Sequence, residues 1–286
     1  MKEIRYFFRT SVSKITNMKF AAFVLIMLMV LYYFVSEIVR VSVDLEYPVT
    51  WCIFPFLFNS NVFISLFWFG IIYINTDIPF MQYSNMYQVI RTGRKKWMVG
   101  NLVGIFFRSL AAVTAVAAGS ILPLLPHMEV TNDWGKLLKT YAMTDMRASY
   151  RLSYEIPYEI MGSYTPVQMM LLMILLLTLI AVFLGVLMLT LSLYGNRRLA
   201  VAADILLILM LFLVLNAYPQ NRMDWAKAVP TVWAQLTKSN TTFGGYYFLP
   251  DVKYMLTFLL IGIVLGSLLC VRRAAHVDLH WVNEDV

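Results

Sequence analysis

The segment VQMMLLMILLLTLIAVFLGVLMLTLSLY, residues 167–194, contains no charged side chain. The uncharged stretch around it extends from Glu159 to Arg197. A helix needs roughly 20 consecutive apolar residues to cross the hydrocarbon core of a bilayer, which is about 30 Å thick. A helix that is apolar on all sides is stable only in a membrane or deep in a protein core. The segment therefore predicts a transmembrane helix.

The composition of the whole chain agrees with this prediction. Of its 286 residues 60% are hydrophobic and 14% are charged, and the mean hydropathy is +0.69. Soluble domains carry about 25% charged residues. Cys52 and Cys270 both lie in apolar runs, so neither a disulfide framework nor a thiolate metal site is expected. The sequence predicts an all-α integral membrane protein.

Further apolar stretches bring the predicted number of transmembrane helices to six, in a single domain over residues 1–286. Long segments, residues 123–166 and 219–253, separate some of them. The second span is unusual because its apolar part, Val62 to Ile74, is too short to cross alone. The predicted spans cover residues 20–39, 49–75, 97–122, 167–194, 199–218 and 254–271, with approximate ends.

The basic residues predict which side of the membrane each loop faces. They gather before the first span, between the second and third, between the fourth and fifth, and after the sixth. The other loops mix acidic and basic side chains. Loops rich in Lys and Arg stay in the cytoplasm, so we interpret the net charge of +7 as a topology signal and expect no nucleic-acid partner. Both termini are predicted to be cytoplasmic in a multi-pass protein of the plasma membrane.

Residues 1–18 are predicted to form an interfacial helix. Apolar residues recur at helical spacing from Ile4 to Ile15, and the basic residues lie mostly on the other side. Such a helix lies on the membrane surface with its cations near anionic lipid headgroups. The alternative is a short basic tail. No small-residue cleavage pattern follows the first apolar run, so a cleavable signal is not expected.

A second short helix is predicted between the second and third spans, where residues 86–97 read MYQVIRTGRKKW. Its apolar patch and the glycine suited to close it are Met86, Tyr87, Val89, Ile90 and Gly93. An amphipathic helix at the membrane surface predicts binding to lipid headgroups or to another protein. The alternative is a basic loop that only follows the charge rule, which explains the cations but not the amphipathic turn.

This architecture resembles that of the ABC-2-type, or exporter-class, ABC transporter permeases. The resemblance rests on the basic N-terminal helix, the six spans with both termini inside, the R-x-x-R-x-x-W motif from Arg91 to Trp97, and the VPTVW segment at residues 229–233. It covers nearly the whole chain. The segment of residues 123–166, between the third and fourth predicted spans, is longer than the family requires. The resemblance assigns this segment no role.

Such a resemblance implies that the helix between spans two and three is a coupling helix, which docks in a groove of a separate ATPase subunit. Its contact residues here would be Gln82, Tyr83, Met86, Tyr87, Ile90 and Arg91. The segment before the sixth span would be a re-entrant hairpin. The resemblance further implies a second permease copy or a sister permease as partner, besides membrane lipid, with ATP and Mg bound by the ATPase.

Polar residues inside the predicted spans are candidate site residues. Arg108 lies about 16 Å along a helix from Trp97, at a depth where an arginine costs about 2.5–3.5 kcal/mol. Asp204 lies about 9 Å into the fifth span and can pair with Arg108 if the third and fifth spans are neighbours. The two residues are expected to form a structural ion pair or to line a transport pathway. Asn59 and Asn61 either bond between helices or line a vestibule.

Sequence motifs of catalysis are absent. The phosphate-binding pattern G-x-x-x-x-G-K-[ST] does not occur, because in its nearest approach Val130 stands where the first glycine must be. No H-E-x-x-H or G-x-S-x-G motif and no histidine inside a span occurs either. The chain is therefore not expected to be an enzyme or to bind a cofactor, and ATP hydrolysis is expected from another subunit.

The sequence thus favours a permease subunit of an ATP-driven exporter for a peptide, antimicrobial or other hydrophobic or amphipathic cargo. One alternative is a secondary transporter or channel that uses Arg108 and Asp204 as an ion relay. Another is a membrane immunity or scaffold protein without transport of its own.

Overall fold

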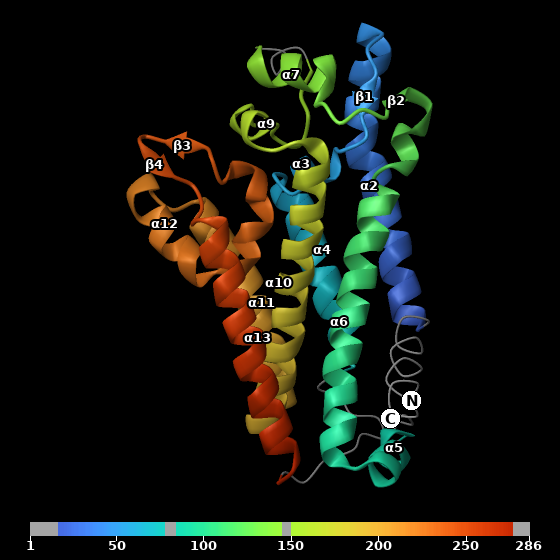
Figure 1. Cartoon of the computed structure of the whole chain (residues 1–286), viewed down its shortest axis with the longest axis vertical. Coiled ribbons are helices and arrows are strands. Elements are labelled where there is room, and N and C mark those ends of the chain that lie inside the picture. The colour runs from blue at the N-terminus through green and yellow to red at the C-terminus, as the bar shows by residue number, and fades with distance from the viewer. Residues whose placement is uncertain (1–16, 78–83, 145–149, 277–286) are drawn as a thin grey trace.

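The computed structural model describes residues 17–77, 84–144 and 150–276, and within them the chain is mostly helical (Figure 1). Among these described residues five helices are long and apolar enough to cross a membrane. This confirms the prediction of an all-α membrane protein. The five helices are α2 (Met18–Leu45), α6 (Arg94–Gly119), α10 (Pro166–Tyr194), α11 (Arg197–Leu215) and α13 (Val252–Ala274). The predicted interfacial helix lies almost wholly outside the described residues.

Shorter elements join and cover these helices. One end of the bundle carries α5, and the opposite end carries α7, α9 and the small strand pairs (Figure 1). Strand β1 pairs with β2 in parallel, and β3 pairs with β4 in a hairpin. The shorter elements are β1 (Val49–Thr50), α3 (Phe54–Leu57), α4 (Asn61–Asn75), α5 (Ser84–Thr92), η1 (Leu122–His127), β2 (Met128–Glu129), α7 (Gly135–Met143), α9 (Glu159–Ser163), α12 (Pro219–Ala228), η2 (Pro230–Lys238), β3 (Thr242–Phe243) and β4 (Tyr246–Tyr247).

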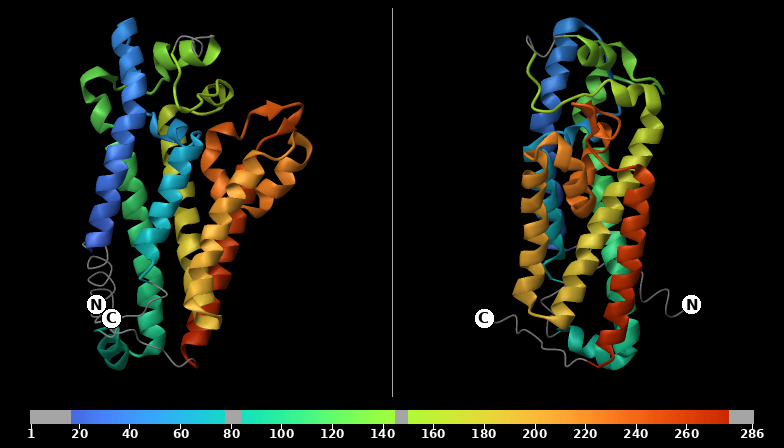
Figure 2. Two further views of the ribbon diagram at one scale, coloured as in Figure 1. Left: turned by 180° about the vertical axis from the view of Figure 1, so that it is seen from behind. Right: turned by 90° about the vertical axis from the view of Figure 1, so that its left-hand side faces the viewer.

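The predicted second span, residues 49–75, is not one helix. It begins with β1, turns through α3 and continues as α4, because Pro55 starts a new helix and the chain turns again at Ser60. The 15 residues of α4 are about 22 Å long, less than a bilayer core. Figure 2 shows α4 ending part-way along α6, well before the α5 end of the bundle.

The first span is longer than its predicted bounds of 20–39. Helix α2 continues to Leu45 although it contains Glu37, Arg40 and Asp44. Glu37 accepts hydrogen bonds from the backbone N–H (2.7 Å) and hydroxyl (2.5 Å) of Ser153. The far turns of α2 therefore support the described residues between 128 and 164 (128–144 and 150–164), which pack on the opposite end of the bundle.

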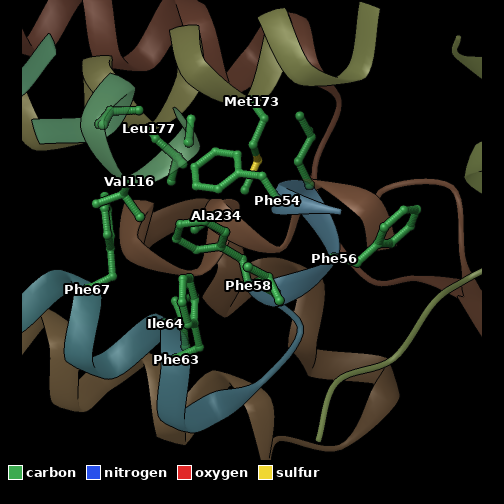
Figure 3. Packing of buried hydrophobic residues seen from close by; sticks show 14 of the residues in the cluster. Phe54, Phe56, Phe58, Phe63, Ile64, Phe67, Val116, Met173, Leu177 and Ala234 are labelled. Atoms are coloured by element: carbon green, nitrogen blue, oxygen red, sulfur yellow. The ribbon is translucent and has the colours of Figure 1, made fainter. Parts of the chain in front are cut away.

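Helix α10 lies at the centre and packs against α6, α11 and α13. Two glycines of α13 allow its close approach, because a Cβ atom at Gly262 or Gly266 would lie 2.7 Å from Phe183 or Val186 of α10. These two glycines therefore serve helix packing. Figure 3 shows the core beside α10, where the rings of Phe58, Phe63 and Phe67 meet edge to face about the turn between α3 and α4.

The segment between α11 and α13 contributes a buried hairpin to the same core. Residues 230–237 of η2 are all buried, and the indole N–H of Trp68 donates to the carbonyl of Thr231 at 3.0 Å. The hydroxyl of Thr231 in turn donates to the carbonyl of Leu207 at 2.9 Å. These bonds tie η2 to both α4 and α11.

A labelling experiment tests whether the broken segment crosses the membrane. Tyr47, at the end of α2, is half exposed, and Lys95, at the start of α6, is exposed. If the chain from β1 to α4 crosses, a cysteine at Tyr47 and a cysteine at Lys95 react with impermeant maleimide from opposite sides of the membrane. A cysteine at Lys136, beyond α6, should react from the Tyr47 side. Labelling of the first two positions from the same side would contradict a crossing.

Candidate coupling helix and buried ion pair

Helix α5 presents apolar side chains outward at its end of the bundle. Tyr87 and Ile90 are 71% and 72% exposed, whereas Val89 is 9% exposed. Val89 belongs to a buried cluster that also contains Trp97 of α6 and Leu193 of α10. The apolar patch predicted from the sequence is therefore divided: one residue anchors the helix, and Tyr87 and Ile90 are left at the surface.

A glycine turn connects α5 to α6. Gly93 has a φ of +82°, which side chains other than glycine rarely adopt, and its N–H donates to the carbonyl of Val89 at 2.8 Å. Helix α6 starts at the next residue. Val89 and Gly93 thus hold α5 at the base of α6.

The predicted contact residues are only partly described. Gln82 and Tyr83 lie outside the described residues, and so does the side chain of Met86. Tyr87, Ile90 and Arg91 are exposed on α5. The exposed cations Arg91, Arg94, Lys95 and Lys96 lie at the end of α5 and the start of α6. An exposed apolar pair within a basic patch suits an acidic-rimmed protein groove or a layer of anionic headgroups.

Arg108 pairs with Asp77 and not with Asp204, which corrects the sequence prediction. One guanidinium nitrogen, Nη1, lies 3.0 Å from Oδ2 and 3.3 Å from Oδ1 of Asp77. Arg108 is 1% exposed, and the Asp77 side chain is 19% exposed. The predicted pair does not form because the assumed adjacency of α6 and α11 is wrong: α10 packs against both.

Two cations hold the end of α4. Besides the Arg108–Asp77 pair, the ammonium of Lys19 donates to the hydroxyl of Thr76 at 3.1 Å. The C-terminus of a helix carries partial negative charge, so cations stabilise it. The neighbouring Asn75 amide is buried and has no hydrogen-bond partner among the described residues. This junction therefore joins α2, α4 and α6 at the point where the chain leaves α4 towards α5.

Asp204 lies in α11 and makes no hydrogen bond to this junction. It is fully buried, and neither carboxylate oxygen has a hydrogen-bond partner among the described residues. Burying an isolated carboxylate in an apolar environment is costly. Asp204 is not bonded to Arg108, and it is a separate candidate.

The two asparagines near α4 have different surroundings. The amide of Asn59 donates to the carbonyl of Glu155 at 2.7 Å, and its oxygen accepts from the hydroxyl of Thr237 at 2.9 Å. It bonds between elements, which was one of the two predicted roles. Asn61 is exposed and lines an open cavity of about 460 Å³. This position is compatible with the other predicted role, that of lining a vestibule.

Asn59→Ala is expected to lower the free energy of unfolding by about 1–3 kcal/mol, because it leaves buried polar groups of two segments unpaired. Asn61→Ala, a matched change at an exposed position two residues away, should alter the free energy of unfolding by less than about 0.5 kcal/mol. Thermal unfolding of the purified protein in lipid nanodiscs measures both. Equal effects of the two changes would refute the bridging role of Asn59.

Asp77 and Lys19 were not identified as site residues from the sequence. The only available signal was that Thr76 and Asp77 directly follow an apolar run too short to span a membrane. Among the described residues no group of three His, Cys, Asp or Glu side chains is arranged to hold a metal ion.

Comparisons of the chain with protein-family models, curated proteins and solved structures found no match. Its function is therefore inferred from the geometry and from the architectural resemblance.

Proposed function

We propose that this chain is the permease subunit of an ATP-driven exporter and that α5 is its contact with the ATPase. One observation carries the proposal: Tyr87 and Ile90 are more than 70% exposed on a short basic helix that Val89 and Gly93 fix to α6. The simplest explanation for exposed apolar residues on an anchored helix is that they bind a partner. The architectural resemblance to exporter-class ABC permeases supports an ATPase as that partner.

Movement of α5 reaches the bundle by two routes in this proposal. The first is α6, which starts directly after Gly93. The second is the chain between α4 and α5, whose first residues are held by Arg108 and Lys19. ATP binding draws the ATPase subunits together, α5 follows, and the junction at the end of α4 transmits the displacement to α2, α4 and α6.

The remaining features belong to the same proposal. The chain crosses the plasma membrane six times, with α4 and its preceding turn as the second span and both termini in the cytoplasm. It works as a dimer with a second copy or a sister permease, and ATP and Mg bind to the ATPase. Helix α13 supplies an apolar surface for lipid or for the second permease, because Leu260, Ile261, Val264 and Leu265 are more than half exposed. The cargo is a peptide, antimicrobial or other amphipathic molecule.

A second candidate is a cation-coupled secondary transporter. It is favoured by Asp204, a fully buried carboxylate without a hydrogen-bond partner among the described residues. Buried acids inside transmembrane segments commonly mark proton or ion pathways. Under this function Asp204→Asn abolishes transport, whereas an exporter driven by ATP retains it.

Purification from native membranes tests the main proposal. The chain should bring with it a subunit that hydrolyses ATP, identified by mass spectrometry and by ATP turnover of the eluate. A complex without ATPase activity, together with transport that depends on a proton gradient and on Asp204, would replace the proposal by the second candidate.

A further inference from the structure

An open cavity of about 460 Å³ lies at the end of the bundle opposite α5. Its volume is within the range of small-ligand pockets. One wall comes from residues 155–159, which precede and begin α9, and the other from the end of α11, from α12 and from the segment after η2. These walls belong to the two long segments between predicted spans, for which the resemblance to permeases supplies no binding role.

The two walls are bonded to each other near the cavity. The ammonium of Lys238 lies 3.0 Å from a carboxylate oxygen of Glu155. The amide of Asn240 donates to the hydroxyl of Ser163 at 2.8 Å, and Asn59 bonds to both sides. The cavity is therefore held open by contacts between its walls, and a ligand does not have to assemble it.

The cavity is lined by two opposite charges that do not pair. The guanidinium of Arg222 donates to the carbonyls of Leu215 (3.2 Å) and Ala217 (3.0 Å) and lies 5.0 Å from the ring centre of Phe248. Among the described residues no carboxylate pairs with it. The exposed carboxylate of Glu159, on the other wall, likewise has no cationic partner within the described ranges.

We propose that this cavity binds a short apolar peptide through its two free termini. The ammonium binds Glu159, the carboxylate binds Arg222, and an apolar side chain lies against Phe248 and Leu215. Two lone charges of opposite sign across a preformed cavity match a zwitterion better than a simple cation or anion, because each ligand charge meets one unpaired group. The ion pair between Lys238 and Glu155 already satisfies the other two charges.

The proposal goes beyond the exporter function, since binding requires neither an ATPase nor transport. The test uses the dipeptide leucyl-phenylalanine, its N-acetyl form and its C-terminal amide, titrated calorimetrically into the purified chain in lipid nanodiscs. Each blocking group should lower the affinity about threefold to fivefold, the contribution of one exposed charge pair. Glu159→Gln should lower the affinity for the free dipeptide equally and leave that for the N-acetyl form unchanged. Arg222→Gln should act in the same way on the carboxylate end.

Matched variants control for general electrostatics and for folding. Glu129→Gln removes an exposed carboxylate from β2, and Lys227→Gln removes a cation from α12 outside the cavity. Both should bind the free dipeptide as the unchanged protein does. Arg222→Lys keeps the charge and should retain most of the affinity. Equal binding of all three dipeptide forms to the unchanged protein would overturn the proposal, and so would full affinity in Glu159→Gln. Neither result bears on the ATPase contact, which is measured separately.

Discussion

Arg108→Leu is expected to lower the free energy of unfolding by about 3 kcal/mol. The change leaves Asp77 without its cationic partner at the end of α4. Removing one member of a buried ion pair typically costs about 3–5 kcal/mol. We expect the lower end of that range because the Asp77 side chain is 19% exposed. Asp77→Asn should lower the free energy of unfolding by a similar amount. The reason is that Arg108 is 1% exposed and its other guanidinium nitrogens have no partner among the described residues. Unfolding in lipid nanodiscs measures both.

The double variant Arg108→Leu with Asp77→Asn separates folding from function. It leaves no uncompensated charge, so stability should return to within about 1 kcal/mol of the unchanged protein. Transport should remain lost, because the junction that links the α4 end to α6 is gone. Recovery of transport together with stability would show that the pair is only structural.

The exposed pair Lys227–Asp224 on α12 is the matched control. Its side chains are 43% and 76% exposed at a distance of 2.9 Å. Lys227→Leu should cost less than about 1 kcal/mol because water and salt screen such pairs. If Arg108→Leu lowered the free energy of unfolding as little as Lys227→Leu, the Arg108–Asp77 pair would not stabilise the fold.

The long helices were predictable because a long uncharged run in a membrane must satisfy its backbone hydrogen bonds internally, which a helix does. Residues 167–194 became α10 with an end shifted by one residue, and Thr165 caps it with a reciprocal bond to Gln168. The end of α5 was predictable as well, because Gly93 is a helix-closing residue. In these places local sequence alone decides the structure.

The ion pair was not predictable, because its members meet through the arrangement of helices. Arg108 and Asp204 have suitable depths and opposite charges, but depth along a helix says nothing about which helices are neighbours. Asp77 comes close to Arg108 only because the second span is broken and α4 ends early. Similarly, the role of Val89 as an anchor depends on Trp97 and Leu193, which no pattern within α5 reveals.

Replacing Tyr87 and Ile90 together by Asp is expected to abolish ATPase binding. Aromatic and apolar residues that are exposed before binding and buried in the complex each contribute about 2–4 kcal/mol at the centre of an interface. Two carboxylates in their place would lower the amount of bound ATPase more than tenfold. The fold should be preserved, because both side chains point away from the bundle.

Co-purification of the ATPase with this double variant is the most direct test of the α5 contact. The control carries the same two substitutions at Val130 and Met143, which are 77% and 66% exposed at the opposite end of the bundle. We expect the control to retain its ATPase and its ATP turnover, and Tyr87→Asp with Ile90→Asp to reach the membrane in normal amount without an ATPase. An undiminished complex with normal ATP turnover in the α5 variant would contradict the assignment of α5 as the motor contact.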